Sequence, residues 1–275
     1  MVRLSTNFMG LKLKSPVIAG SSGLTNSIDN VKQLADHGAG AVVLKSLFEE
    51  QIQLETEKLL DSDNDKVRPW KTTFGDIISS RSYDYAEALD YISNYAKEHT
   101  LSDYLRFISE LKKSVDIPVI ASINCVSAYE WSYFARRIQE AGVDALELNV
   151  YVLPSNPAKN GEDNEKIYFD VVSEVKKHVS IPVSLKIGYY FSGLSNKIIE
   201  LSKTGISSLV LFNRPYSPDF DIGNFEITAG NILSTPAEYS HTLRWVAILA
   251  GRLGCEIAAS TGIHDAGTAI KQILA

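Results

Sequence analysis

The chain has 275 residues, of which 45% are hydrophobic and 22% are charged, a composition typical of a folded globular protein. Its net charge of −6 argues against nucleic acid or an anionic membrane as the main partner. The first residues lack a signal-peptide core, and no apolar run is long enough to span a bilayer. The two cysteines, Cys125 and Cys255, lack metal-ligand spacing. We therefore expect a cytoplasmic protein with two buried thiols, no metal site and a small-molecule substrate.

One pattern recurs along the chain: a helical stretch, a glycine, a short gap and an apolar run. The three copies are LADHGAGAVVLKS (34–46), IQEAGVDALELNV (138–150) and LSKTGISSLVLFN (201–213). The glycine suits the left-handed position that ends a helix, and a continuously apolar run is typical of a strand covered on both faces. The pattern predicts parallel strands separated by helices, for example helices over 128–141 and 235–251. The expected strands lie near 16–20, 41–46, 118–123, 145–150, 182–187, 208–213 and 256–260.

Seven such strands favour an α/β fold of the (β/α)8 TIM-barrel type, with residues 1–275 forming a single domain. A doubly wound open sheet is the alternative, although no G-x-G-x-x-G follows the first strand. The pattern ends at the helix of IKQILA, so we expect the last βα unit to be missing from this chain. Residues 50–113 form a long insertion after the second strand, for which a capping excursion and a lid over the site are equally good interpretations.

Polar residues stand where the predicted strands end, and in a barrel this is the edge that carries the chemistry. In chain order they are Ser21, Ser22, Gly23, Lys45, Ser46, Asn124, Asn149, Lys186, Asn213, Ser260, Thr261 and Gly262. An asparagine at this position often only caps a turn, which is the simpler interpretation of Asn124. Lys45 and Lys186 follow buried runs, where an unpaired charge is costly, so we expect each to meet an anion or take part in chemistry.

The segment STGIHDAGTAIKQI is a glycine-containing turn that opens a helix. Its backbone N–H groups and the helix N-terminus suit a phosphate, and barrel phosphate sites commonly follow strands seven and eight. A phosphate site, two lysines and several amides together describe a site for flavin mononucleotide (FMN).

Five segments in the expected order resemble the dihydroorotate dehydrogenase family, particularly its soluble class 1 branch. They are LSTNFMGLKLKSPVIAGSSGLT, AGAVVLKS, DALELNV, PVSLKI and AASTGIHDAGTAIKQIL. The resemblance implies an N-terminal β-hairpin, an FMN-binding TIM barrel and a cytoplasmic homodimer that oxidises dihydroorotate in pyrimidine biosynthesis. Together, the strand-end positions and the resemblance predict that the flavin is bound by Ser22, Gly23, Lys45, Ser46, Asn124, Asn149, Lys186, Asn213, Ser260, Thr261 and Gly262.

The loop after Asn149 departs from the family pattern, because no Cys or Ser precedes its proline. Tyr151 and Ser155 are the remaining candidate proton acceptors, and an unaided hydroxyl is a weak base near neutrality. Lys45 is predicted to act in catalysis as well, and Lys45, Asn149 and Asn156 to contact the substrate. The alternatives are a Schiff-base lyase or aldolase that uses Lys186, or a catalytically silent flavin- or phosphate-binding barrel.

Overall fold

The computed structural model describes residues 4–48, 101–125, 128–214, 218–229 and 233–275. Its main element is a parallel sheet that curls into a half-barrel, in which the strand order is β12-β9-β8-β7-β6-β4-β3. The strands are β3 (Ile18–Ala19), β4 (Ala41–Val43), β6 (Val119–Asn124), β7 (Ala145–Val150), β8 (Val183–Ile187), β9 (Ser208–Leu211) and β12 (Glu256–Ala259). All seven strands expected from the sequence are confirmed, and the TIM-barrel type of fold with them.

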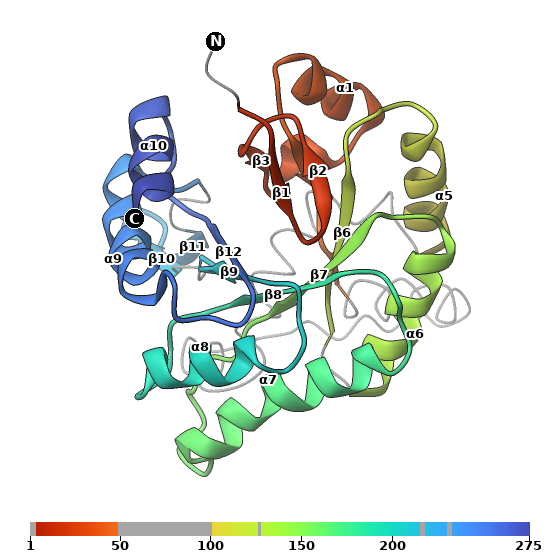
Figure 1. Ribbon diagram of the computed structural model, residues 1–275. Coiled ribbons are helices and arrows are strands. Elements are labelled where there is room, and N and C mark those ends of the chain that lie inside the picture. The colour runs from red at the N-terminus through yellow and green to blue at the C-terminus, as the bar shows by residue number, and fades with distance from the viewer. Residues whose placement is uncertain (1–3, 49–100, 126–127, 215–217, 230–232) are drawn as a thin grey trace, which may run out of the picture.

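Helices cover the outer face of this sheet and follow its strands in chain order (Figure 1). They are α1 (Ile28–Asp36), α5 (Leu101–Lys112), α6 (Ala128–Glu140), α7 (Gly161–Lys176), α8 (Leu194–Ser202), α9 (Tyr239–Leu249) and α10 (Ala266–Leu274). Gly38, Gly142 and Gly205, the glycines of the recurring pattern, have φ angles of 95°, 94° and 82°. The left-handed backbone that ends each helix there explains why glycine recurs at this point.

Alternate strand residues face opposite sides of the curled sheet. Leu146 and Leu148 of β7 face the helices in the larger core cluster, whereas Ala145 faces the barrel interior. The predicted N-terminal hairpin, β1 (Thr6–Phe8) with β2 (Leu11–Leu13), packs against this inner face. Phe8 and Leu13 thereby fill the barrel interior at the amino ends of the strands, which leaves the carboxyl ends for a site.

Residues 101–112, the last part of the predicted insertion, form helix α5, which packs in the main core through Tyr104, Ile108 and Leu111. This segment is therefore the helix that connects the second and third strands of the barrel. Residues 49–100, and with them the choice between a cap and a lid, lie outside the described residues.

A second hairpin, β10 (Pro218–Asp221) with β11 (Glu226–Ala229), follows β9.

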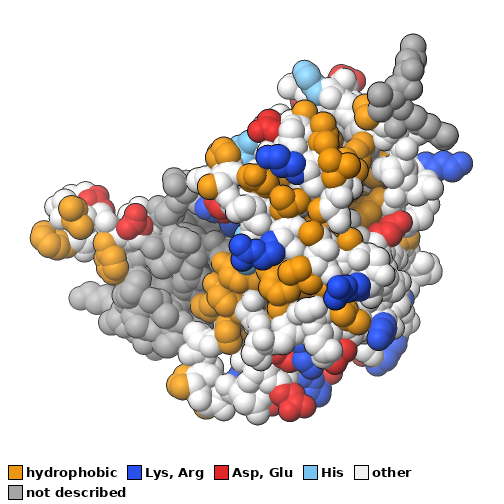
Figure 2. Space-filling view, turned by 60° about the vertical axis from the view of Figure 1, so that its left-hand side comes forward, with side chains coloured by type: hydrophobic (Ala, Val, Ile, Leu, Met, Phe, Trp, Pro, Cys, Tyr) orange, Lys and Arg blue, Asp and Glu red, His pale blue; other side chains and the backbone are white. Residues whose placement is uncertain are grey.

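Strands β12 and β3 are the two edges of the sheet within the described residues. Helix α10, beside β12, exposes Ile270, Ile273 and Leu274, with exposed fractions of 55%, 63% and 80%. Figure 2 turns this side of the molecule forward and shows hydrophobic side chains gathered on it.

Among the described helices, none is long and apolar enough to cross a membrane. Cys125 and Cys255 are both thiols, the first buried and the second half-buried.

Candidate active site

A layer of polar side chains crosses the barrel interior, where branched apolar residues are usual. Ser122 on β6, Glu147 on β7, Ser184 on β8 and Ser208 on β9 are successive partners in the strand register, and all four are buried. The Ser208 hydroxyl donates to that of Ser184 at 2.9 Å, and the Ser122 hydroxyl donates to Glu147 Oε1 at 3.2 Å. The candidate site lies on this layer.

Asn149 and Lys186 form the next layer toward the carboxyl ends of the strands. They are register partners on β7 and β8, and alternation places both on the inner face. Asn149 is 8% exposed, yet its Oδ1 atom has no hydrogen-bond partner among the residues that the structure describes. Lys186 is half-buried and forms no ion pair within the described part of the chain. A buried acceptor without a donor is costly, so this pair is suited to a ligand that presents an N–H group beside an acceptor or negative charge.

The segment that contains Lys45 and Ser46 forms a β-bulge between β4 and β5 (Leu47–Phe48). Val43 of β4 pairs with Ile120, and Leu47 of β5 pairs with Ile123. Between these two pairs the β4–β5 segment has one residue more than β6, which is the definition of a β-bulge. Because of this extra residue, Ser46 faces inward with Ser122, and the two hydroxyl oxygens are 2.8 Å apart.

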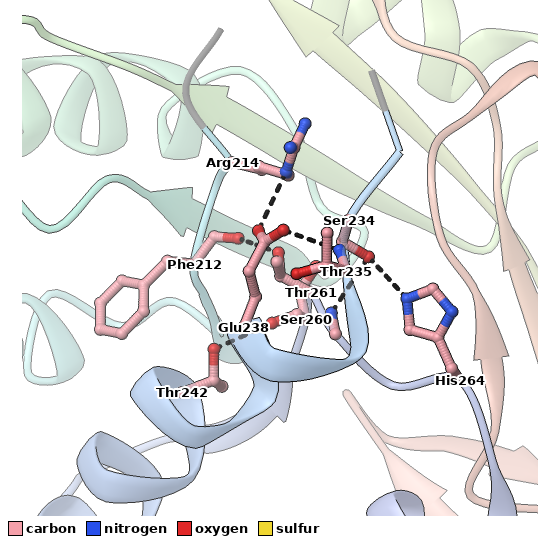
Figure 3. Close-up of polar contacts among 10 residues, drawn as sticks. Phe212, Arg214, Ser234, Thr235, Glu238, Thr242, Ser260, Thr261 and His264 are labelled. Atoms are coloured by element: carbon pink, nitrogen blue, oxygen red, sulfur yellow. Dashed lines mark hydrogen bonds and ion pairs between the residues drawn. The ribbon is translucent and has the colours of Figure 1, made fainter. Parts of the chain in front are cut away.

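The turn Ser260–Gly262 lies against the start of α9 (Figure 3). Thr261 and Gly262 have φ angles of 79° and 75°, and a Cβ atom on Gly262 would lie 2.2 Å from the Tyr239 backbone nitrogen. Only glycine fits this contact without displacing the backbone. The Gly262 N–H donates to Ser234 Oγ at 3.2 Å, and Ser234 also contacts His264 Nε2 at 3.2 Å.

Two charged residues fix the chain that precedes α9. The Arg214 Nε atom lies 3.0 Å from Glu238 Oε2, and the other carboxylate oxygen accepts the Thr235 backbone N–H at 2.7 Å. Burial alone would raise the pKa of Glu238, but the hydrogen bonds from Thr235 and Arg214 outweigh it and lower the pKa overall. The carboxylate therefore stays charged and holds Arg214 close to the Ser260–Gly262 turn (Figure 3).

The N-terminus of helix α10 already has an anionic cap. Asp265 accepts the Thr268 backbone N–H at 2.7 Å, and this bond lowers the pKa of the Asp265 carboxyl. A phosphate near this point would therefore meet a carboxylate, not free N–H groups, at the Asp265 cap of the helix.

The loop after β7 contains the candidate bases. The Tyr151 ring lies 3.3 Å from the position that a Gly188 Cβ would take, and 6.1 Å from the Tyr190 ring centroid. Ser155 is half-buried, and its backbone N–H donates to the Leu153 carbonyl at 2.8 Å. Asn156 is exposed and accepts the Ala158 N–H through its side chain at 2.9 Å.

The other predicted residues also lie at the carboxyl ends of the strands. Ser22 caps the 3₁₀ helix Gly23–Thr25, so its hydroxyl accepts the Leu24 N–H. Asn124 is the last residue of β6, and the Asn213 N–H donates to the Ile187 carbonyl at 2.7 Å. The predicted set thus surrounds the end of the half-barrel, although the roles of its members stay predictions.

Sequence reasoning did not single out Ser122, Arg214, Ser234 and Glu238. Glu147 lies within the segment DALELNV, which resembles the family, but the sequence indicates no role for it. The alternation of strand residues would have placed Glu147 and Ser122 on the inner face, but their register requires the paired sheet. The remaining three act through contacts between loops that no local pattern indicates.

A curled parallel half-barrel with polar and cationic residues at the carboxyl ends of its strands defines an α/β protein of the TIM-barrel type with a candidate site at that end. The chain is 28% identical over its whole length to the catalytic subunit of dihydroorotate dehydrogenase B (NAD(+)) of Thermoplasma volcanium, covering 84% of that protein. It is 25% identical over 80% of its length to the corresponding subunit of Methanocaldococcus jannaschii, covering 65% of it. No family model matches the chain. The chain is related to the dihydroorotate dehydrogenases.

A further relative comes from Escherichia coli and is the NAD-dependent dihydropyrimidine dehydrogenase subunit PreA. It is 22% identical over 76% of this chain, which covers 48% of that subunit. Both kinds of relative are named as dehydrogenases of pyrimidine-type compounds.

Proposed function

We propose that this protein is an FMN-dependent oxidoreductase acting on a CH–CH bond, with dihydroorotate or a related dihydropyrimidine as substrate. The relatives' names support the reaction class. The observation that carries the cofactor is the Asn149 Oδ1 atom beside Lys186, for which the described part of the chain provides no hydrogen-bond donor. The pyrimidine edge of a flavin presents an N–H donor next to carbonyl acceptors, which matches this amide and this lysine.

Each residue has a definite task in this proposal. Asn149 accepts the ring N–H, and Lys186 neutralises charge on the adjacent carbonyl side. The turn over Ser260, Thr261 and Gly262 lies at the phosphate end of the site. Its Ser260 and Gly262 N–H groups already donate to the Leu211 carbonyl and to Ser234 Oγ, so the Thr261 N–H is the backbone donor assigned to the phosphate. FMN, when bound, supplies the hydride acceptor. Ser22, Gly23, Ser46, Asn124 and Asn213 complete the flavin contacts.

On the substrate side, Lys45, Asn149 and Asn156 orient the dihydropyrimidine. Ser155 or Tyr151 takes the proton from the carbon next to the one that loses hydride, and passes it to water or to a neighbouring group because a hydroxyl alone is a weak base. Dihydroorotate turnover that survives the double substitution Ser155→Ala and Tyr151→Phe would exclude both residues as the base. From the same resemblance we propose that the protein is a cytoplasmic homodimer that acts in pyrimidine biosynthesis. Analytical ultracentrifugation of the full chain would test whether it forms a dimer.

The proposal is tested by titrating the full chain with FMN and recording quenching of flavin fluorescence. We expect saturable binding that weakens about tenfold in Asn149→Leu, because this change removes one acceptor of about 1.4 kcal/mol at a buried site. Ser184→Ala, one layer deeper, serves as the control and should bind FMN as the wild type does. A chain that binds no FMN, or an Asn149→Leu variant with unchanged affinity, would refute the cofactor assignment. A protein that binds no FMN but is trapped on Lys186 by borohydride with a carbonyl substrate would instead be a Schiff-base enzyme.

A further inference from the structure

Three serine hydroxyls connect the rim of the candidate site to a buried carboxylate. Ser21 Oγ lies 3.1 Å from Ser46 Oγ, which lies 2.8 Å from Ser122 Oγ. Ser122 Oγ in turn donates to Glu147 Oε1 at 3.2 Å. Ser46, Ser122 and Glu147 are buried, with exposed fractions of 7%, 0% and 4%, whereas Ser21 is half-buried. The hydrogen-bonded chain therefore begins at the strand ends and finishes inside the barrel.

The backbone around this chain is fixed independently of the hydroxyls. The Ser122 N–H donates to Tyr104 Oη at 3.3 Å, and this phenol is itself 3.4 Å from the Ser122 carbonyl. Burial raises the pKa of Tyr104, so the phenol keeps its proton and remains a hydrogen-bond donor to that carbonyl. The Ser46 N–H donates to Ser21 Oγ at 2.9 Å. The serine oxygens therefore keep their positions, and only the directions of their O–H bonds are left to be assigned.

A count of protons assigns those directions, since each serine hydroxyl has one hydrogen to donate. The Ser122 hydroxyl donates to Glu147 Oε1, so the Ser122 hydrogen points to that oxygen. Ser122 then accepts from Ser46, because the hydrogen between these two oxygens must come from the other residue. By the same reasoning Ser46 accepts the hydrogen of Ser21. The carboxylate at one end thus sets the polarity of all three bonds.

This polarity leaves Ser21 with a single remaining function toward a ligand. Its hydrogen points to Ser46 and one lone pair accepts the Ser46 N–H. What remains is the second lone pair, which can only accept a hydrogen bond. A ligand that presents an N–H group to Ser21 gains a bond there, whereas one that presents an acceptor meets a lone pair.

We propose that Ser21 is a specificity-determining residue of the strand-end site, held by Glu147 through Ser46 and Ser122 as an obligate acceptor, and that it favours reduced over oxidised flavin. The inference rests on the proposed function, since it takes FMN as the ligand. Reduction of the isoalloxazine ring adds an N–H group where the oxidised ring has an acceptor nitrogen. An acceptor-only hydroxyl therefore stabilises the reduced form and repels the oxidised one.

The test compares the dissociation constants of the full chain for oxidised FMN and for FMN reduced anaerobically by dithionite. In Ser21→Ala we expect the preference for reduced FMN to fall about fivefold, the typical effect of one neutral hydrogen bond. For a two-electron couple this corresponds to a midpoint potential lower by roughly 20 mV. Ser122→Ala, which frees the Ser46 hydrogen to reverse, should lower the preference in the same direction by a smaller factor.

Ser184→Ala is the matched control, because it removes a buried inward hydroxyl of the same layer that lies outside the chain of Ser21. It should lower the stability of the fold without changing the ratio of the two dissociation constants. If Ser21→Ala fails to fold, Ser21→Cys keeps the shape, replaces the oxygen by a poor acceptor and should give the same direction of change.

Equal weakening of both FMN forms in Ser21→Ala would show a purely structural role and overturn the inference, as would an unchanged ratio. Either result would leave FMN binding, and so the proposed function, standing. A wild-type chain that binds neither form would instead reject the proposed function itself, and the inference with it.

Discussion

Replacing Gly262 by alanine tests the close contact between the Ser260–Gly262 turn and the start of α9. The added Cβ would lie 2.2 Å from the Tyr239 nitrogen, 2.8 Å from its Cα and 2.9 Å from the Glu238 carbonyl carbon. All three atoms belong to the backbone, so no side-chain rotation relieves the clash. Overpacking of this kind typically costs about 1–3 kcal/mol, and the φ angle of 75° adds the strain of a left-handed alanine, roughly 1–2 kcal/mol.

The matched control is Gly251→Ala. Gly251 has a φ angle of 71°, but a Cβ there meets nothing within 4 Å. Both substitutions share the left-handed strain and the loss of flexibility in the unfolded chain, so their difference isolates the steric clash. Urea denaturation should therefore show Gly262→Ala to be less stable than Gly251→Ala by about 1–3 kcal/mol. Equal stabilities of the two variants would refute the contact between the turn and α9, and with it the geometry assigned to the phosphate end of the site.

Three further predictions concern stability and reactivity. Ile108→Ala should destabilise the fold by about 2–5 kcal/mol in urea denaturation, because Ile108 is completely buried. Arg106 is exposed on the same helix, and a loss of stability no larger than that of Arg106→Ala would place α5 outside the core. Burial raises the pKa of the Cys255 thiol to about 11. In a variant that retains Cys255 as its only thiol, iodoacetamide should therefore react slowly at neutral pH and about tenfold faster for each added pH unit. A reaction rate equal to that of the urea-unfolded chain would contradict the burial of this thiol. The hydrogen bond from Thr268 holds the pKa of the Asp265 carboxyl below its ordinary value of 3.8. The stabilisation from this carboxylate is therefore complete above pH 3.8 and is lost as the pH falls through the lowered pKa. Asp265→Asn should remove part of the dependence of unfolding on acid pH, and identical unfolding curves of the two proteins at acid pH would argue against this cap.

The strands and helices follow from local patterns in the sequence. The runs that became β7 and β8 are apolar and rich in branched residues, and Gly142 and Gly205 mark the helix ends before β7 and β9 by their positive φ angles. These features depend on neighbours along the chain, so one sequence is enough to predict them. Helix α5 was assigned to an insertion, because the long stretch before it obscured its place as a regular barrel helix.

The site followed from the sequence only in outline. The order of strand ends predicts which residues share an edge, and it placed Asn149 and Lys186 together, as the register confirms. The bulge before Ser46 could not be predicted, because it is defined by pairing with β6. The contact of Gly262 with Tyr239 also depends on segments far apart in the chain. Such features require the tertiary structure, since no local preference encodes them.

The central claim is that a flavin bound at the strand ends oxidises a dihydropyrimidine. Its most direct test is to load the full chain with FMN, exclude oxygen, add dihydroorotate or dihydrouracil, and follow the visible absorbance of the oxidised flavin. We expect one of these substrates to bleach the flavin, and the bleaching to slow markedly in Lys45→Ala. A bound flavin that dithionite reduces but neither dihydropyrimidine bleaches would contradict the account.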